Sequence, residues 1–431
     1  MKHRKPLFPG RRFSVARFVA FLVVVAIVAT AVWGWLTATR FSSKELPAPW
    51  FGGYADVTST PSYTFESDVG DVYKNVVLGF VTASAAGCTP SWGGYYTMDE
   101  AASQLDMDSR IARTSRSGRT VTISFGGQAG SELASSCPTE QELKQAYDSV
   151  ISRYHVTSID FDIEEGNLNA SSEVSARRAQ AVAQLQREAE ESGGTLTVGL
   201  TLPVGRDGLT DLGRETVESF LDAGVNLASL NVMAMDFNVP STTTDQATLI
   251  KDALNATHSQ YRAMLYARGK LFNDTQIWEM MGVTVLIGQN DTDGEVFTLD
   301  DAQQINTFAL QANLGRVNMW SLNRDQQCGE NASVTSTQTS CSGMKQTTGE
   351  FATILGSSFR GTPGTLVDMN TTWESNGSSY PEWDDNTHYA KGDKVVWNNQ
   401  IYEALADNSG VKPDSTSEGT GSPWRLIGPT H

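Results

Sequence analysis

The sequence predicts a closed parallel (β/α)8 barrel of the TIM type, followed by a small all-β module. Short apolar runs alternate with longer helical stretches, which is typical of a parallel sheet. Eight such runs occur, enough to close a barrel, and polar or aromatic residues end most of them, where a barrel collects its active site. A doubly wound open sheet is the alternative, and the polar ends of the runs favour the barrel.

The predicted barrel strands are residues 51–57, 75–82, 120–127, 158–164, 196–203, 229–237, 283–291 and 316–325. Amphipathic stretches lie between them, and each is preceded by turn or capping residues. The predicted helices are residues 140–153, 173–192, 214–223, 247–267 and 298–314. Together these elements predict a (β/α)8 catalytic domain over residues 50–356.

The N-terminus predicts export of the rest of the chain. Residues 1–17 are basic and residues 18–36 form an uncharged apolar run, long enough to span a bilayer. Because positive charge gathers before the run, we expect residues 1–17 in the cytoplasm and everything after a tether at 37–49 outside. Ala29-Thr30-Ala31 is a candidate cleavage site, so the run is either a transmembrane signal anchor or a signal peptide. The predicted location is extracellular, secreted or anchored to the membrane.

Composition narrows the possible partners and chemistry. A length of 431 residues with 39% hydrophobic content suits one large domain plus an accessory module. The net charge of −17 argues against a nucleic acid partner. The five histidines are scattered, which argues against a zinc site or a Ser-His-Asp triad. We therefore expect no metal, no cofactor, and a monomer that meets the membrane only through its N-terminus.

Four cysteines without Cys-x-x-Cys spacing agree with an oxidising compartment. Three pairings are possible. We favour Cys88 with Cys137 and Cys328 with Cys341, because the partners of each pair would then lie in neighbouring loops of the barrel.

The segment Ser158-Ile-Asp-Phe-Asp-Ile-Glu164 is the strongest indication of a functional site. A strand alternates its side chains, so Asp160, Asp162 and Glu164 share one face. Three carboxylates on one strand face repel each other and lower stability unless function requires them. The intervening apolar residues suit the outer barrel face under the helices, which places the acids in the barrel interior.

The spacing of these acids suits one kind of glycoside cleavage. Glu164, last in the predicted strand, would reach the mouth of the barrel and protonate a leaving oxygen. Asp162 lies one pleat deeper, too close to Glu164 to activate a water on the opposite face of a sugar. A substrate that carries its own nucleophile, the 2-acetamido group, removes that difficulty, and this is the substrate-assisted scheme.

The chain here resembles glycoside hydrolase family 18, the chitinases and their relatives, whose signature is Asp-Gly-x-Asp-x-Asp-x-Glu. Asp160, Asp162 and Glu164 match the signature, while Thr157 and Ser158 replace its first two residues. The resemblance implies that Glu164 is the general acid/base and that Asp162 orients the acetamido group and stabilises the oxazolinium intermediate. It also implies that Asp160 supports Asp162 from beneath.

Two further motifs resemble those of the same family. Ser124-Phe-Gly-Gly127 is similar to the family's Ser-x-Gly-Gly, so Ser124 is expected to bond the carboxylates. The run Asn231-Val-Met-Ala-Met-Asp-Phe237 is similar to Met-x-Tyr-Asp, which places Met233 and Asp236 near the reacting sugar. Met235 occupies the position of the family tyrosine, so a shifted tyrosine or Gln289 is the candidate replacement.

Other strand ends add candidate substrate contacts. Trp320 ends the eighth predicted strand, as the tryptophan floor of the family does, and would stack against a sugar. Phe237 and Gln289 end the sixth and seventh strands and are expected on the same rim. Individually, each of these residues also suits a role in the core or at a turn.

The C-terminal part reads as a linker and a small β module. Residues 357–379 are rich in Ser, Thr, Gly and Asn, and residues 380–431 contain a predicted hairpin with Asn398-Asn399 at its turn. Through its motifs at Tyr389, Tyr402 and Trp424, the module resembles chitin- and cellulose-binding modules of carbohydrate-binding families 5 and 12. The candidate binding aromatics are Trp383, Trp397, Tyr402 and Trp424. The alternative is that these aromatics form the core of the module, and Trp424 fits that best.

The sequence therefore predicts an exported, endo-acting chitinase that hydrolyses β-1,4-linked N-acetylglucosamine with retention while its tail binds the polymer. One alternative is an endo-β-N-acetylglucosaminidase that acts on other glycans or peptidoglycan. A second alternative is a non-catalytic chitin lectin, against which the presence of Glu164 argues.

Overall fold

The structure is a computed structural model that describes residues 48–330, 332, 336–364, 383, 387–397, 400–413 and 423–429. The basic segment, the apolar run and almost all of the tether predicted at the N-terminus lie outside these residues. Most of the predicted linker and the Asn398-Asn399 turn also lie outside them. No helix among the described residues is both long and apolar enough to span a bilayer.

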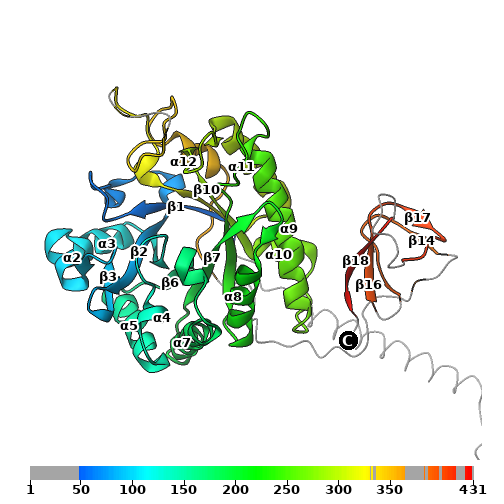
Figure 1. Cartoon of the computed structure of the whole chain (residues 1–431), viewed down its shortest axis with the longest axis horizontal. Coiled ribbons are helices and arrows are strands. Elements are labelled where there is room, and N and C mark those ends of the chain that lie inside the picture. Colours follow the sequence, from blue (N-terminus) through cyan, green and yellow to red (C-terminus); the bar gives the residue numbers. More distant parts are fainter. Residues whose placement is uncertain are drawn as a thin grey trace, which may run out of the picture. The chain divides into compact units, whose positions relative to one another are not determined.

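Eight parallel strands close into a barrel, as the sequence predicts (Figure 1). Their order around the barrel is β1, β2, β5, β6, β7, β9, β10 and β13, and β13 pairs with β1 to close it. The strands are β1 (Trp50–Asp56), β2 (Asn75–Ser84), β5 (Thr120–Gly126), β6 (Ser158–Asp162), β7 (Thr197–Gly205), β9 (Leu227–Met233), β10 (Met281–Leu286) and β13 (Arg316–Trp320).

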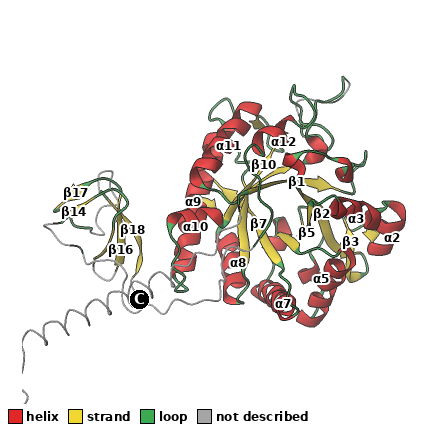
Figure 2. Ribbon diagram, turned by 180° about the vertical axis from the view of Figure 1, so that it is seen from behind, coloured by secondary structure: helices red, strands yellow, loops and turns green. Residues whose placement is uncertain are grey.

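Helices surround the barrel (Figure 2). All five predicted helices are present as α5 (Glu140–Tyr154), α7 (Ser172–Glu191), α8 (Asp211–Asp222), α9 (Gln246–Tyr266) and α11 (Leu299–Ala312). A side chain caps the N-terminus of each by accepting a backbone N–H, which satisfies a donor that the first turn leaves unpaired. The shorter helices are α2 (Met98–Gln104), α3 (Met107–Arg116), α4 (Leu133–Ser136), α6 (Glu165–Leu168), α10 (Asp274–Glu279) and α12 (Glu350–Leu355).

Several predicted strands end too late. The strand with the carboxylates ends at Asp162, so the prediction that Glu164 is its last residue is wrong. Likewise, β9 ends at Met233, β10 at Leu286 and β13 at Trp320, so Asp236 and Gln289 lie beyond their barrel strands. At this end of the barrel the polar residues bond to rim loops instead of extending the strand ladder.

The outer face of β6 carries apolar side chains into the layer beneath the helices, as predicted. Phe161 stacks on Phe125 of β5 with ring centroids 5.5 Å apart and makes edge contacts with Tyr147 of α5 and Phe220 of α8. Ile159 and Ile163 are also buried. This packing fixes the register of β6 and directs its acids into the barrel.

Two disulfides are present, Cys88–Cys137 and Cys328–Cys341, which confirms the favoured pairing. The first joins β3 (Gly87–Trp92), in the hairpin after β2, to the end of α4. Nearby, Glu132 and Arg178 form a fully buried ion pair, and Tyr147 donates a hydrogen bond to Glu132.

The barrel unit extends slightly beyond the predicted boundary at residue 356. The carbonyl of Ser357 accepts a hydrogen bond from Asn306, and the carbonyl of Gly361 accepts one from Asn75. The N–H of Gly361 donates to the carbonyl of Pro49. Residues 357–361 therefore pack as part of the barrel unit, although their composition resembles that of the linker.

The C-terminal module contains a three-stranded antiparallel sheet of β15 (Lys394–Trp397), β16 (Gln400–Ala404) and β18 (Trp424–Pro429). The antiparallel pairing of β15 with β16 confirms the predicted hairpin. A second small sheet pairs β14 (His388–Tyr389) with β17 (Asn408–Ser409). Tyr402 and Trp424 belong to the buried core, so they are not exposed sugar contacts; Trp383 and Trp397 are only partly buried against this core.

Candidate active site

The three acids of the signature occupy successive depths of the barrel. Asp160 and Asp162 of β6 are buried, with exposed fractions of 0% and 3%. Glu164 follows the strand and is half-buried at the mouth. Its carbonyl accepts a hydrogen bond from the N–H of Asn167, which starts the short helix α6. The acids thus run from the barrel interior to its carboxyl-terminal rim.

Asp160 is surrounded by hydrogen-bond donors from four strands. Tyr54 and Ser124 donate to its Oδ2 at 2.8 and 2.9 Å. Thr201 and the Arg316 guanidinium donate to its Oδ1 at 2.8 and 2.7 Å. These four donors, one of them cationic, hold the Asp160 carboxyl group in a fixed orientation.

We call Asp160 with its four donors the anchor of the site. The residues around it support this arrangement. Burial, and next the Asp160 charge, raise the pKa of Tyr54, so its hydroxyl stays protonated and keeps donating. Gly199 on the neighbouring strand leaves the space that Asp160 and Arg316 need, because a Cβ there would lie 2.7 Å from both side chains.

Asp162 and Glu164 form a coupled pair above this anchor. Burial raises the pKa of Asp162 well above its usual range, and the neighbouring charges of Glu164 and Asp160 add to the effect. The two side chains share a hydrogen bond. Two carboxyl groups that interact this closely hold a proton between them more readily than an isolated acid does. Asp162 Oδ1 is buried and has no hydrogen-bond partner within the described part of the chain.

The Gly126-Gly127 pair lets the backbone pass directly beside Asp162. Gly126 has φ +106°, and a Cβ there would lie 2.0 Å from the carbonyl oxygen of Asp162. The N–H of Gly127 donates to that same oxygen at 2.8 Å. Any larger residue at position 126 would displace Asp162, which explains the glycines of the Ser-x-Gly-Gly motif.

An aromatic cluster lies beside the acids. Trp320 is partly exposed and stacks on Phe80 with ring centroids 5.4 Å apart, and Tyr54 lies 6.1 Å from both rings. Since the hydroxyl of Tyr54 bonds to Asp160, this cluster connects the aromatic surface to the base of the carboxylate site.

The other predicted rim residues follow β9 and β10. Met233 is buried at the end of β9. Asp236 has a left-handed backbone with φ 53°, and its Oδ1 accepts the N–H of Thr292 at 2.8 Å. Burial is the main cause that raises the pKa of Asp236.

Two partners hold the loops around Phe237 and Gln289. The N–H of Phe237 donates to the buried Glu295 at 3.0 Å. The carbonyl of Gln289 accepts from Arg324 at 2.7 Å. The hydrogen bonds described for Asp236 and for these two backbones tie the rim loops to each other rather than to the acids of β6.

Sequence reasoning missed Tyr54, Phe80, Thr201, Glu295 and Arg316. Arg316 and Asn318 alternate on the last strand as Asp160 and Asp162 do on β6, so the same argument would have found Arg316. Tyr54 and Phe80 lie in apolar strands and look like ordinary core residues. Glu295 lies in a short hairpin between β11 (Gly288–Gln289) and β12 (Val296–Phe297), where no sequence pattern marks it.

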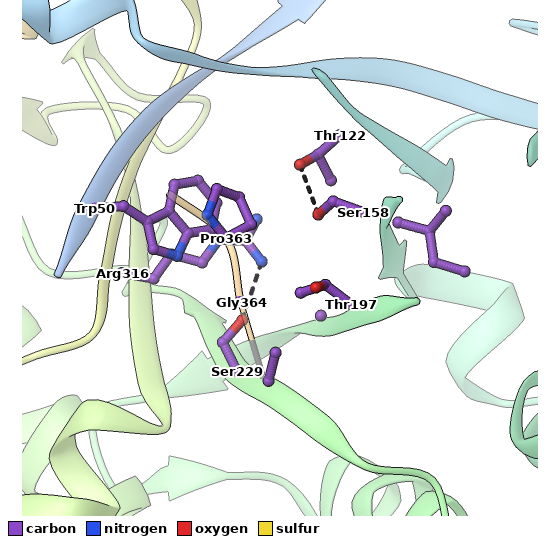
Figure 3. A pocket seen from close by; sticks show the side chains of 11 residues that line it. Trp50, Thr122, Ser158, Thr197, Ser229, Arg316, Pro363 and Gly364 are labelled. Atoms are coloured by element: carbon purple, nitrogen blue, oxygen red, sulfur yellow. Dashed lines mark hydrogen bonds between the residues drawn. The ribbon is translucent and has the colours of Figure 1, made fainter. Parts of the chain in front are cut away.

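A small pocket lies at the other end of the barrel, and Arg316, which binds Asp160, also lines it (Figure 3). It is lined by residues near the starts of the strands, among them Trp50, Ser158, Thr197 and Arg316. Thr122 donates to Ser158, and Arg316 to Ser229, across it. Active sites of such barrels lie at the carboxyl ends of the strands. We therefore assign the residues of this pocket to the packing of the barrel floor and not to the active site.

Comparison with known proteins identifies relatives of this barrel. The probable bifunctional chitinase/lysozyme of Escherichia coli K12 is 33% identical over 268 residues, which cover 60% of this chain and 29% of that protein. Endochitinase 11 of Metarhizium anisopliae is 32% identical over 259 residues, covering 58% of this chain and 48% of that protein. The chain therefore spans less than half the length of these curated relatives. No protein-family model matches it.

Solved structures match a larger share of this chain than the two curated relatives do. The catalytic domain of a hyperthermophilic chitinase from Pyrococcus furiosus is 26% identical, with a TM-score of 0.63 over 74% of this chain and 99% of that one. This barrel is similar in sequence and fold to the catalytic domain of that chitinase. A catalytic-site mutant of active domain 2 of the Pyrococcus furiosus chitinase, complexed with chito-oligosaccharides, gives a TM-score of 0.62 at 25% identity. Similarity to these chitinase domains agrees with the three acids and the Ser-x-Gly-Gly turn described above.

Proposed function

We propose that this protein is an exported chitinase, which hydrolyses β-1,4-linked N-acetylglucosamine polymers and retains the anomeric configuration. The pairing of Asp162 with Glu164 carries the proposal. Both acids come from the end of one strand, and buried Asp162 Oδ1 has no partner among the described residues. Such a pair provides a proton donor and an adjacent acceptor, but no second base on the opposite face of a sugar.

The proposed reaction uses the acetamido group of the substrate as the nucleophile. Glu164 gives its proton to the glycosidic oxygen, and the C1–O bond breaks as the acetamido carbonyl oxygen bonds to C1. Asp162 Oδ1 accepts the acetamido N–H and balances the positive charge of the resulting oxazolinium ion. Glu164, now ionised, removes a proton from water, which attacks C1 and regenerates the acetamido group.

The surroundings of the pair support these roles. Asp160 accepts four hydrogen bonds, so its carboxyl group is held in place and serves to fix and polarise the site above it rather than to transfer protons. Its negative charge also favours protonation of the Asp162–Glu164 pair. Trp320 offers a partly exposed ring on which the apolar face of a sugar can stack.

We also propose that the C-terminal module binds the polymer and that the protein is exported. Trp383 and Trp397 meet edge to face at 5.2 Å in the module, and Lys412 lies against both rings. These partly exposed aromatics are the proposed contacts to chitin. The basic and apolar N-terminal sequence and the two disulfides support an extracellular location.

The name of the Escherichia coli relative favours a second candidate substrate, since that protein is called a chitinase/lysozyme. Peptidoglycan also carries 2-acetamido sugars and suits the same chemistry. The decisive experiment offers the full chain soluble chitin oligosaccharides and purified peptidoglycan, and separates the products by chromatography. The chitinase proposal is supported if the wild-type chain cleaves the oligosaccharides and the Glu164→Gln variant does not. Cleavage of peptidoglycan alone would establish the second candidate.

A further inference from the structure

The hairpin after β2 presents an exposed aromatic residue close to the aromatic floor. Its strands are β3 and β4 (Tyr96–Thr97), and the turn between them contains Gly93, Gly94 and Tyr95. Tyr95 is 81% exposed, whereas the preceding Trp92 is completely buried. Tyr95 therefore presents its ring to solvent at a turn whose neighbouring residues, Gly94 and Tyr96, are partly buried.

The backbone holds this turn rigidly. Gly93 and Gly94 have φ angles of +62° and +80°, which glycine adopts without strain. The N–H of Tyr95 donates to the carbonyl of Trp92 at 3.1 Å, and the N–H of Gly93 donates to the carbonyl of Phe80 at 2.9 Å. The second bond fixes the turn directly against Phe80, whose ring stacks on Trp320.

A second series of contacts places the turn on the rim of the active site. Gly93 packs against Thr58, which follows β1 and bonds through its N–H to Asp56. Asp56 in turn exchanges two backbone hydrogen bonds with the side chain of Asn323, just after Trp320. The ring of Tyr95 lies over Gly93, since a Cβ on that glycine would be 3.3 Å from Tyr95 Cδ2.

We propose that Tyr95 is a distal sugar-binding platform, which stacks against a residue of the polymer beyond the one that rests on Trp320. The proposal rests on the proposed chitinase activity and adds a determinant of substrate length to it. An exposed ring on a turn that backbone hydrogen bonds already order binds the apolar face of a sugar at reduced entropic cost, because the turn need not be reorganised. Short substrates that occupy only the sites beside Glu164 do not reach it.

The test compares kcat/KM for chitohexaose with kcat/KM for a short fluorogenic chitobioside, using the full chain and its Tyr95→Ala and Tyr95→Trp variants. We expect Tyr95→Ala to lower the ratio of long to short substrate about tenfold and Tyr95→Trp to keep it. Val69→Ala is the matched control, because Val69 is 83% exposed on a different segment. An unchanged ratio in Tyr95→Ala, or the same loss on both substrates, would overturn the platform.

The same experiment separates failure of the platform from failure of the proposed activity. If the wild-type chain cleaves neither substrate, the chitinase proposal fails, and calorimetric binding of chitohexaose by the wild type and by Tyr95→Ala decides the platform alone. The tail contributes equally in both proteins. An affinity reduced several-fold in Tyr95→Ala then supports the platform, and an equal affinity rejects it.

Discussion

Asp162 and Glu164 share a hydrogen bond at the carboxyl end of one strand, and the charge of Glu164 adds to burial in raising the pKa of Asp162. The pair lies above Asp160, whose two oxygens accept four hydrogen bonds. The three acids therefore have different environments: Asp160 is fixed by four donors, Asp162 is a buried acid with a raised pKa, and Glu164 is a half-buried acid at the mouth. This gradient allows three neighbouring carboxyl groups to take different roles.

Replacement of the acid at the mouth should abolish turnover. Glu164→Gln keeps the shape of the side chain but cannot donate the proton, so we expect kcat to fall at least about 10³-fold while oligosaccharide binding persists. Initial rates and calorimetric titration measure the two effects. Glu173→Gln, on an exposed position of α7, is the control and should retain activity. Substantial residual hydrolysis by Glu164→Gln would remove Glu164 from the acid role.

Asp162 should make stability depend on pH. Its folded-state pKa lies above the unfolded value, so the folded state binds the extra proton and wild-type stability falls as pH rises above the usual Asp pKa. Asp162→Asn removes the buried charge. We therefore expect this variant to gain stability relative to the wild type between about pH 4 and pH 8, measured by thermal unfolding. If the difference in Tm between Asp162→Asn and the wild type is constant over this range, ionisation of Asp162 does not destabilise the folded state.

The anchor beneath the pair should be important for stability. Arg316→Met leaves the fully buried Asp160 without its cation, and we expect a loss of about 3–5 kcal/mol in the free energy of unfolding. Adding Asp160→Asn should recover part of that loss, because no unpaired charge remains. Denaturant titration of the single and double variants measures both. The exposed pair Arg206 and Asp252 gives the control, since Arg206→Met should cost less than about 1 kcal/mol. Equal costs for the two arginine variants would contradict the role of the anchor.

Removal of the tail should affect only the solid substrate. Because Gly361 still bonds to Asn75 and Pro49, the deletion should begin at residue 365 and leave those contacts intact. We expect unchanged rates on soluble oligosaccharides and a several-fold loss on solid chitin, since the module raises local concentration without adding catalytic contacts. Similar losses on both substrates would mean that the tail belongs to the catalytic unit.

The fold and the acid row were predictable from the sequence because both follow from strand periodicity. The alternation of Asp160, Asp162 and Glu164 with apolar residues is sufficient by itself to indicate the inward face of the strand. The end of β6 was not predictable, because Ile163 still donates to the carbonyl of Thr201 after the regular ladder stops.

The partners of Asp160 were harder to predict. Arg316 is 156 positions away in the sequence and reaches Asp160 only because the barrel closes. Tyr54 lies in a strand rich in apolar residues and glycine, so its role depends on which strand faces it across the barrel. The position of Tyr95 near Phe80 depends on the hydrogen bond between Gly93 and Phe80, which no local pattern indicates.

The most direct measurement is NMR detection of the anomer first formed when soluble residues 41–431 cleave chitin oligosaccharides. The account predicts that the β-anomer appears first and converts slowly to the equilibrium mixture, because the acetamido group of the substrate attacks C1 before water does. Initial formation of the α-anomer would require direct attack by water on the opposite face. That result would contradict the role of the Asp162–Glu164 pair.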